Sequence, residues 1–97
     1  MDYRVILSPQ AIRDLETIVR YVAITNPELA KKLGQQLLDK TKELGVFPFR
    51  GRVVPEFNDV NVRQLILRPY RIIYRVEEPI HQVSVARFWH TARGFLE

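Results

Sequence analysis

The sequence predicts a two-layer α+β protein, in which an N-terminal strand and an antiparallel helical hairpin precede and pack on a mainly antiparallel sheet, in the order β-α-α-β-β-β. Two adjacent stretches place apolar residues at helical spacing, separated only by a Thr-Asn-Pro break. Three later stretches alternate apolar and polar residues, and the gaps between them are so short that neighbouring strands must form antiparallel hairpins. The 97 residues suit a single domain, residues 1–97.

The first elements are marked by local signals. Residues 3–7 (YRVIL) are predicted to form a short strand. Ser8 follows as the N-cap of a helix that opens with Pro9, because the missing N–H of proline costs nothing at that position. Asn26 and Pro27 repeat the same signal, so a second helix begins at once and must fold back on the first.

Gly34 stands in the middle of the second predicted helix, where glycine costs about 1 kcal/mol relative to alanine. We interpret it as the position at which the two helices approach closely, with tolerated drift as the alternative. The segment 46–61 is predicted to be irregular, because prolines and a glycine interrupt it. Phe47 and Phe49 are expected to pin this crossing segment to the core.

Three strands are predicted over residues 62–68, 70–78 and 82–90. In the middle strand one face is apolar and the other carries charge; the faces hold Ile72, Tyr74 and Val76 against Arg71, Ile73, Arg75 and Glu77. In the last strand strict alternation places Val83, Val85, Arg87 and Trp89 on one face and Ser84, Ala86, Phe88 and His90 on the other. If the first of these faces is buried, the charge of Arg87 must be paired.

Composition restricts the classes of function. The net charge of +4 and a pI of about 9.8 permit an acidic partner, either nucleic acid or an acidic peptide. Without cysteine there is no disulfide framework or thiolate chemistry, and we expect no metal and no cofactor. The N-terminus lacks a secretory pattern and no window approaches a membrane span, so a cytoplasmic protein without a membrane partner is expected.

The basic residues change type along the chain. Every basic residue from Arg50 onward is arginine, whose planar fork of donors suits carboxylates and phosphates. Two interpretations stay open: a recognition surface, or a solvated sheet face that uses arginine by chance.

Four segments together resemble the ParE/RelE superfamily of bacterial toxins from type II toxin–antitoxin pairs, and within it the ParE-like branch. They are SPQAIRDLETIVRYVAITNPELAKKL, FPFRGR, VRQLILRPYRIIYRV and ARFWHTARG. The branch carries a similar helical hairpin with Asn-Pro at its bend, and a Pro-x-x-Gly-Arg turn matched by Pro48, Gly51 and Arg52. It also carries an arginine ahead of a "YRI-Y" strand and a closing "H-x-x-R" segment.

The resemblance implies a toxin that is held inactive by an antitoxin, whose disordered C-terminal segment folds across it in a hetero-oligomer. ParE-like members block DNA gyrase and are not known as nucleases, whereas RelE-like members cleave messenger RNA on the ribosome. We prefer gyrase inhibition, which makes the chain a binding protein with no catalytic residues. A ribosome-dependent endoribonuclease is the alternative, and a toxin fold that has lost activity is a third.

The candidate site residues differ between the two activities. For antitoxin or target binding they are Arg63, Arg71, Arg75, Arg87 and Trp89. A nuclease needs an acid, a base and cations at the phosphate, and its candidates are Arg63, Arg71, His90 and Arg93, with Tyr70 or Tyr74 assisting. Arg71 and His90 also have ordinary structural interpretations, as a solvated arginine and as a strand-closing histidine. The paired lysines of RelE-like nucleases are missing here, since no lysine follows Lys42.

Overall fold

Two helices and the strands of one sheet make up the part of the chain that the structure, a computed structural model, describes, residues 2–93. The elements in chain order are β1 (Arg4–Leu7), α1 (Pro9–Ala23), α2 (Pro27–Lys42), β2 (Arg52–Val53), β3 (Val62–Leu67), β4 (Tyr70–Glu77) and β5 (Gln82–His90). Short 3-10 turns follow α2, β4 and β5. The predicted order is confirmed, and β2 is an additional two-residue strand inside the segment expected to be irregular.

Both helices begin where their start signals predict. The Ser8 hydroxyl accepts the Ala11 N–H at 3.0 Å, and the Asn26 side chain accepts the Leu29 N–H at 3.0 Å. The helices then run back along each other, and a Cβ added at Gly34 would lie 3.0 Å from a methyl carbon of Val19. Glycine therefore permits the close approach of α1 and α2, as the sequence indicated.

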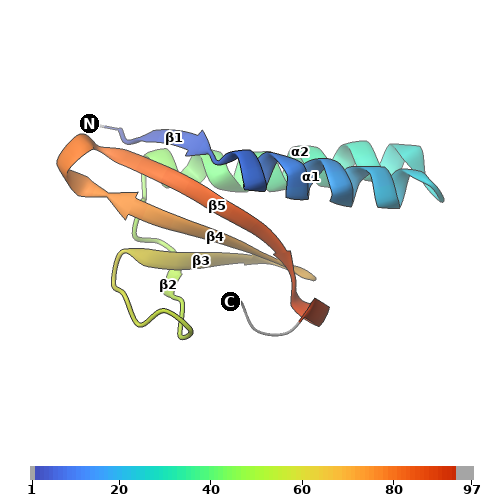
Figure 1. The fold of residues 1–97 in the computed structure, drawn as a ribbon. Helices are drawn as coiled ribbons and strands as arrows, with labels where there is room; N and C mark the ends of the chain where they lie inside the picture. The colour runs from blue at the N-terminus through green and yellow to red at the C-terminus, as the bar shows by residue number, and fades with distance from the viewer. Residues whose placement is uncertain (1, 94–97) are drawn as a thin grey trace.

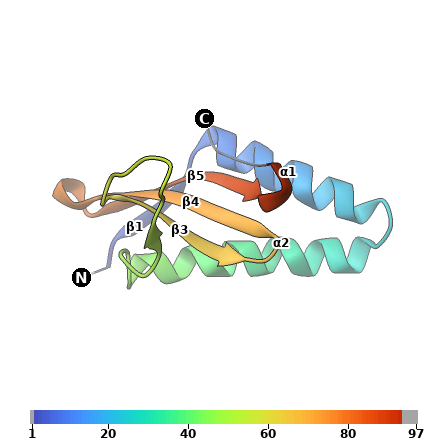
Figure 2. The ribbon, with the colours of Figure 1, turned by 90° about the horizontal axis from the view of Figure 1, so that it is seen from below.

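The sheet has the strand order β1-β5-β4-β3-β2. The pairs β2–β3, β3–β4 and β4–β5 are antiparallel, as their short connections require, and β1 pairs with β5 in parallel. Both helices cover the same face of this sheet, and their distal halves project past its end (Figures 1 and 2). No helix within residues 2–93 combines the length and apolar character that a bilayer crossing requires.

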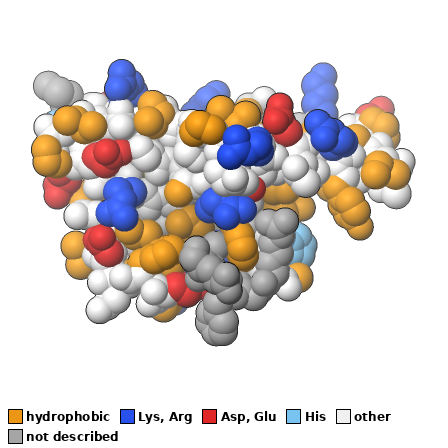
Figure 3. Space-filling view, viewed as in Figure 1, with side chains coloured by type: hydrophobic (Ala, Val, Ile, Leu, Met, Phe, Trp, Pro, Cys, Tyr) orange, Lys and Arg blue, Asp and Glu red, His pale blue; other side chains and the backbone are white. Residues whose placement is uncertain are grey.

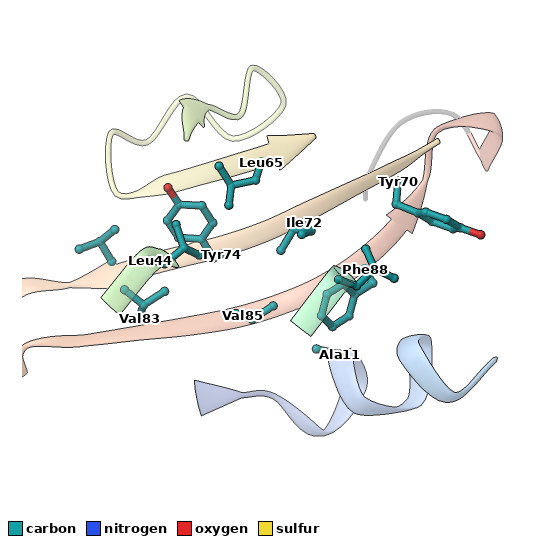
Figure 4. Close-up of a cluster of buried hydrophobic side chains, with 11 residues drawn as sticks. Ala11, Leu44, Leu65, Tyr70, Ile72, Tyr74, Val83, Val85 and Phe88 are labelled. Carbon is teal, nitrogen blue, oxygen red and sulfur yellow. The ribbon is translucent and has the colours of Figure 1, made fainter. Parts of the chain in front are cut away.

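The main core lies between the helices and the sheet (Figure 4). Ile72, Tyr74 and Val76 point from β4 into it, as their alternation predicts. The hydroxyl of the buried Tyr74 accepts a hydrogen bond from the backbone N–H of Gly51 at 2.9 Å. This bond anchors the segment between α2 and β3 to the centre of the sheet.

The predicted faces of β5 are wrong beyond Val85. The register between β4 and β5 shifts between Ile73 and Tyr74: Tyr74 lies opposite Val85, but Ile73 lies opposite Arg87. Ala86 is therefore an extra residue, a β-bulge, and the alternation reverses after it. Phe88 joins the core, with about 1% of its surface exposed, whereas Arg87 and Trp89 lie on the opposite face.

The expected anchoring of segment 46–61 by two phenylalanines is also wrong. Phe47 is 53% exposed and Phe49 38% exposed. The segment is held instead by the Gly51–Tyr74 bond and by Val54, which is fully buried against Val62 and Ile73 on the other side of the sheet.

Candidate functional site

The face of the sheet away from the helices, called here the second face, gathers most of the predicted binding residues. Strands β4 and β5 direct Arg71, Arg75, Arg87 and Trp89 to it, around the buried Ile73. Arg71 lies directly opposite Trp89 in the ladder, and the Arg87 guanidinium stacks over the Trp89 ring at 4.8 Å. Four of the five predicted binding residues are thus neighbours.

Arg71 is bound to the protein's own carboxylate. Its two terminal nitrogens donate to the two oxygens of Glu56 at 2.9 and 3.0 Å, and its Nε donates to Gln64. Both side chains of this ion pair are only 13% exposed. This pair and the bond to Gln64 use three of the five guanidinium N–H donors. Because the pair is also largely buried, Glu56 limits the access of a phosphate or a partner carboxylate to Arg71. The alternative interpretation of Arg71 as a solvated arginine is wrong, because its side chain is largely buried.

Arg75 is more accessible. It contacts Asp59 at 3.2 Å, but its side chain is 54% exposed. The N–H of Asn61 and the Arg75 guanidinium together hold the pKa of Asp59 below its ordinary value. Further along the same strand, hydrogen bonds from the Ser84 hydroxyl and the Gln82 amide lower the pKa of Glu77. All these carboxylates are ionised at neutral pH and offset the arginines of the second face.

Arg87 connects the second face to the helices. Strand β1 ends at Leu7, opposite Val85, so beyond that point no strand of the described residues lies beside this edge of β5. The Arg87 side chain lines hollows on both sides of the sheet and makes two hydrogen bonds to Asp14 of α1, at 2.8 and 3.1 Å. The condition under which the sequence required a pair, burial of Arg87 beside Val83 and Val85, does not arise, because Arg87 lies on the second face with its side chain 30% exposed. Its charge is paired all the same.

Beyond the end of β1, the Asp14 side chain lies beside the edge of β5 and takes one of the backbone hydrogen bonds that a longer β1 would have made. Its carboxylate accepts the backbone N–H of Phe88 at 3.1 Å and the side-chain amide of Gln10 at 2.9 Å. Burial of this side chain opposes ionisation, but the hydrogen bonds from Arg87, Gln10 and Phe88 outweigh it, so the pKa of Asp14 lies below its ordinary value.

Arg63 is the predicted binding residue that the structure separates from the others. It lies opposite Tyr74, on the helix-facing side of β3. Its guanidinium donates to the carbonyls of Gly51 at 2.9 Å and Val60 at 2.9 Å, and stacks over Phe49 at 4.9 Å. The observed role of Arg63 is to fasten the loops on either side of β2.

Three residues of the nuclease alternative, Arg63, Arg71 and His90, are not brought together. Arg71 and Arg63 lie on opposite faces of the sheet. His90 lies opposite Tyr70 of β4, whereas Arg63 lies opposite Tyr74. These two positions of β4 are four residues, or about 13 Å, apart. The side chain of Arg93, which ends the last turn, lies outside what the structure describes.

His90 lines a hollow of about 420 Å³ between α1 and the end of β5, together with Tyr70. The two rings meet edge to face at 5.3 Å, and His90 Nδ1 accepts the Ala92 N–H at 3.0 Å. His90 thus closes the strand, as its structural interpretation held, but its backbone partner is an N–H group and not a carbonyl. Burial raises the pKa of Tyr70 and of Tyr74, so both phenols are protonated at neutral pH.

Sequence reasoning missed the acidic partners Asp14, Glu56 and Asp59. Asp14 carries a weak signal, since it is an acidic residue next to an apolar helical stripe. Glu56 and Asp59 lie in an irregular segment, where no periodicity indicates what they face.

Comparison with solved structures defines the class of fold. The chain is similar to a structure of the chromosomal ParDE toxin–antitoxin system from P. aeruginosa, with a TM-score of 0.76, 23% identity and coverage of 91% of this chain and 95% of the other. It is also similar to the toxin–antitoxin complex RelBE2 from Mycobacterium tuberculosis, with a TM-score of 0.67, 19% identity and coverage of 93% and 99%. A free-state mutant of E. coli toxin RelE gives a TM-score of 0.68, 18% identity and coverage of 97% and 88%. The fold is that of the RelE/ParE-like toxins.

The sequence itself gives the family. Residues 5–95 match the family described as "ParE toxin of type II toxin-antitoxin system, parDE". The chain therefore belongs to the ParE toxin family. No curated protein sequence matches it.

Proposed function

We propose that this chain inhibits bacterial growth by binding DNA gyrase in the cytoplasm, and that it does not cleave RNA. The observation that carries the proposal is the ion pair of Arg71 with Glu56. A nuclease of the RelE type needs free cations at the phosphate, but here the Arg71 charge is neutralised by the largely buried Glu56, whose oxygens lie 2.9 and 3.0 Å from its nitrogens. Membership of the ParE family supports the same conclusion.

Purified protein tested against two targets distinguishes the activities. Added to a gyrase supercoiling reaction, the chain is expected to block supercoiling; added to cell-free translation, it is expected to leave the message intact. Codon-phased cleavage of the message would overturn the proposal in favour of the endoribonuclease, and silence in both reactions would indicate a fold that has lost its activity.

We further propose that a cognate antitoxin covers the second face in a hetero-oligomer. The two toxin–antitoxin structures similar to this chain, ParDE and RelBE2, support an antitoxin as partner. Arg75, Arg87 and Trp89 would contact it, since a partly exposed cation beside an aromatic ring suits an acidic segment with apolar side chains.

Arg75 gives the sharpest test of this surface, because its side chain is 54% exposed and its loss disturbs little else. We expect Arg75→Ala to weaken binding of the antitoxin several-fold at low salt. Arg20→Ala, on the exposed outer side of α1, is the matched control. Equal affinity of the wild type and Arg75→Ala would remove Arg75 from the interface.

A further inference from the structure

The loop after α2 presents apolar side chains to solvent where the sequence predicted core contacts. Val46 is 56% exposed, Phe47 53% and Phe49 38%, and they border a shallow hollow of about 380 Å³. Val60, 66% exposed, joins them through the hydrogen bond of its carbonyl to Arg63, whose guanidinium covers one side of the Phe49 ring. These five residues are called the phenylalanine patch. On the face seen from the side of α1, apolar side chains are instead interspersed with Lys, Arg, Asp and Glu (Figure 3).

The patch is held in one conformation by hydrogen bonds on both sides. The backbone N–H of Phe47 donates to the Glu43 carbonyl at 3.0 Å, and that of Arg50 donates to the Phe47 carbonyl at 3.1 Å. At its far end Gly51 is bonded to Tyr74. The Arg50 guanidinium stacks over Phe47 at 4.7 Å. Exposed aromatic rings that are already immobilised lose little entropy on binding, which is the property of hot spots in protein interfaces.

Charge distinguishes the possible occupants of the patch. Arg50 is neutralised by Glu43 at 2.8 Å, whereas Arg63 donates to carbonyls and has no carboxylate partner within residues 2–93. One uncompensated cation beside apolar rings suits an apolar protein surface flanked by a carboxylate. A single-stranded nucleic acid requires a continuous row of cations along its phosphates, and this end of the molecule mixes acidic and basic residues instead.

We propose that the phenylalanine patch is the surface by which this toxin contacts its growth-inhibition target, a folded protein with an apolar pocket and an adjacent carboxylate. Short, rigid, protruding rings fit a preformed pocket, whereas a disordered antitoxin segment needs a long strand edge or groove. The inference rests on the proposed function as a target-binding toxin, and it assigns a role to the Pro-x-x-Gly-Arg turn, whose Gly51 fixes the loop.

The test is growth arrest on induced expression without antitoxin, combined with the supercoiling assay. The double variant Phe47→Ala, Phe49→Ala is compared with the wild type and with Tyr21→Ala, which removes an equally large exposed ring, 75% accessible, from the hairpin tip. We expect the double variant to need at least about tenfold more protein for either effect, with an unchanged melting temperature, and Tyr21→Ala to act as the wild type.

Each other outcome is decisive. A double variant that arrests growth at wild-type levels overturns the assignment, and would place the patch under the antitoxin or leave it unused. Binding of a labelled single-stranded RNA 20-mer that the double variant loses would also overturn it, in favour of nucleic acid. If the wild type arrests growth but does not inhibit gyrase, the choice of gyrase fails while the growth assay still tests the patch. A wild type that does not arrest growth overturns both.

Discussion

Individual arginines of this protein are positioned by carboxylates from distant parts of the chain. Glu56, fifteen residues before Arg71, binds its guanidinium through both carboxylate oxygens. Asp14 binds Arg87, seventy-three residues further along the chain. Removing one partner of a buried pair is costly because the other charge is left buried without a counterion, whereas removing one partner of an exposed pair changes little. Arg71, whose side chain is bound to Glu56 and only 13% exposed, is thereby less accessible than the sequence indicated.

Loss of the Glu56 carboxylate tests the buried pair. We expect Glu56→Gln to lower the free energy of unfolding by about 2–3 kcal/mol, because Arg71 keeps its charge but loses its counterion. Glu43→Gln is the matched control: its pair with Arg50 is as short, 2.8 Å, but the side chains are 38% and 48% exposed, so a change below about 1 kcal/mol is expected. Urea unfolding measures both, and equal effects would contradict the role given to burial.

The lowered pKa of Asp14 predicts how the stability of the fold depends on pH. Its pKa is lower in the folded protein than in the unfolded chain, so the carboxylate stabilises the fold above the unfolded-state pKa of about 4, and this stabilisation is lost as the pH falls through the folded-state value. We expect Asp14→Asn to be less stable at neutral pH by about 2–3 kcal/mol, and to lose less further stability below about pH 4 than the wild type.

Urea titrations from neutral pH to about pH 3 measure this difference. Asp39→Asn is the control, because Asp39 is 59% exposed and its contact with Lys42 is long, 3.9 Å. If the wild type and Asp14→Asn lost the same free energy of unfolding between neutral pH and about pH 3, ionisation of Asp14 would not be coupled to folding.

At the scale of elements, the structure follows the sequence where the signals are local. Ser8 and Asn26 cap their helices as predicted, because a cap depends on residues within one turn. The alternation of β4 is also correct along its whole length. Strand β5 departs from prediction at Ala86. A bulge is set by the pairing with the neighbouring strand, and the alternation of residues along β5 alone does not predict where it occurs.

The loop between α2 and β3 depends on one glycine. A Cβ at Gly51 would lie 2.5 Å from the Gln64 carbonyl oxygen and 2.6 Å from the Tyr74 hydroxyl. We expect Gly51→Ala to destabilise the fold by about 2–3 kcal/mol, because the backbone must move and the Tyr74 bond is lost.

Gly34→Ala provides the comparison, measured by thermal unfolding. Its new Cβ would meet only the end of the Val19 side chain, at 3.0 Å, and alanine favours a helix interior by about 1 kcal/mol. A Gly51→Ala protein as stable as Gly34→Ala would show that the loop adapts.

At the scale of the whole molecule, the order of elements, the helical hairpin and the two-layer packing could be predicted from the sequence. The placement of charge could not. Which arginine meets which carboxylate is a matter of tertiary contact, and Glu56 and Asp59 come from a segment without periodicity. The exposure of Phe47 and Phe49 could not be predicted either. In a segment without periodicity, the sequence does not distinguish a buried aromatic residue from one that is exposed to solvent.

The projecting hairpin predicts uneven local stability. Its distal turns carry exposed apolar residues, with Tyr21 75% and Ile24 77% accessible, and have no strand beneath them. We expect backbone amides near this bend to exchange with deuterium fastest among the helical amides, and those of β4 and β5, at the centre of the sheet, to exchange slowest. Hydrogen exchange followed by mass spectrometry measures this, and uniform protection along α1 would contradict it.

The extra residue in β5 separates the effect of strand length from that of side-chain type. Deleting Ala86 itself would leave a regular strand in which Arg87, now directly after Val85, still lies on the second face and Phe88 still lies in the apolar layer. A strand that kept its length but lost the bulge would instead turn the cation of Arg87 into the apolar layer and Phe88 out to water. In aligning relatives, a gap at Ala86 is therefore compatible with the same outward surface, whereas a relative of equal length without the bulge would present a different one.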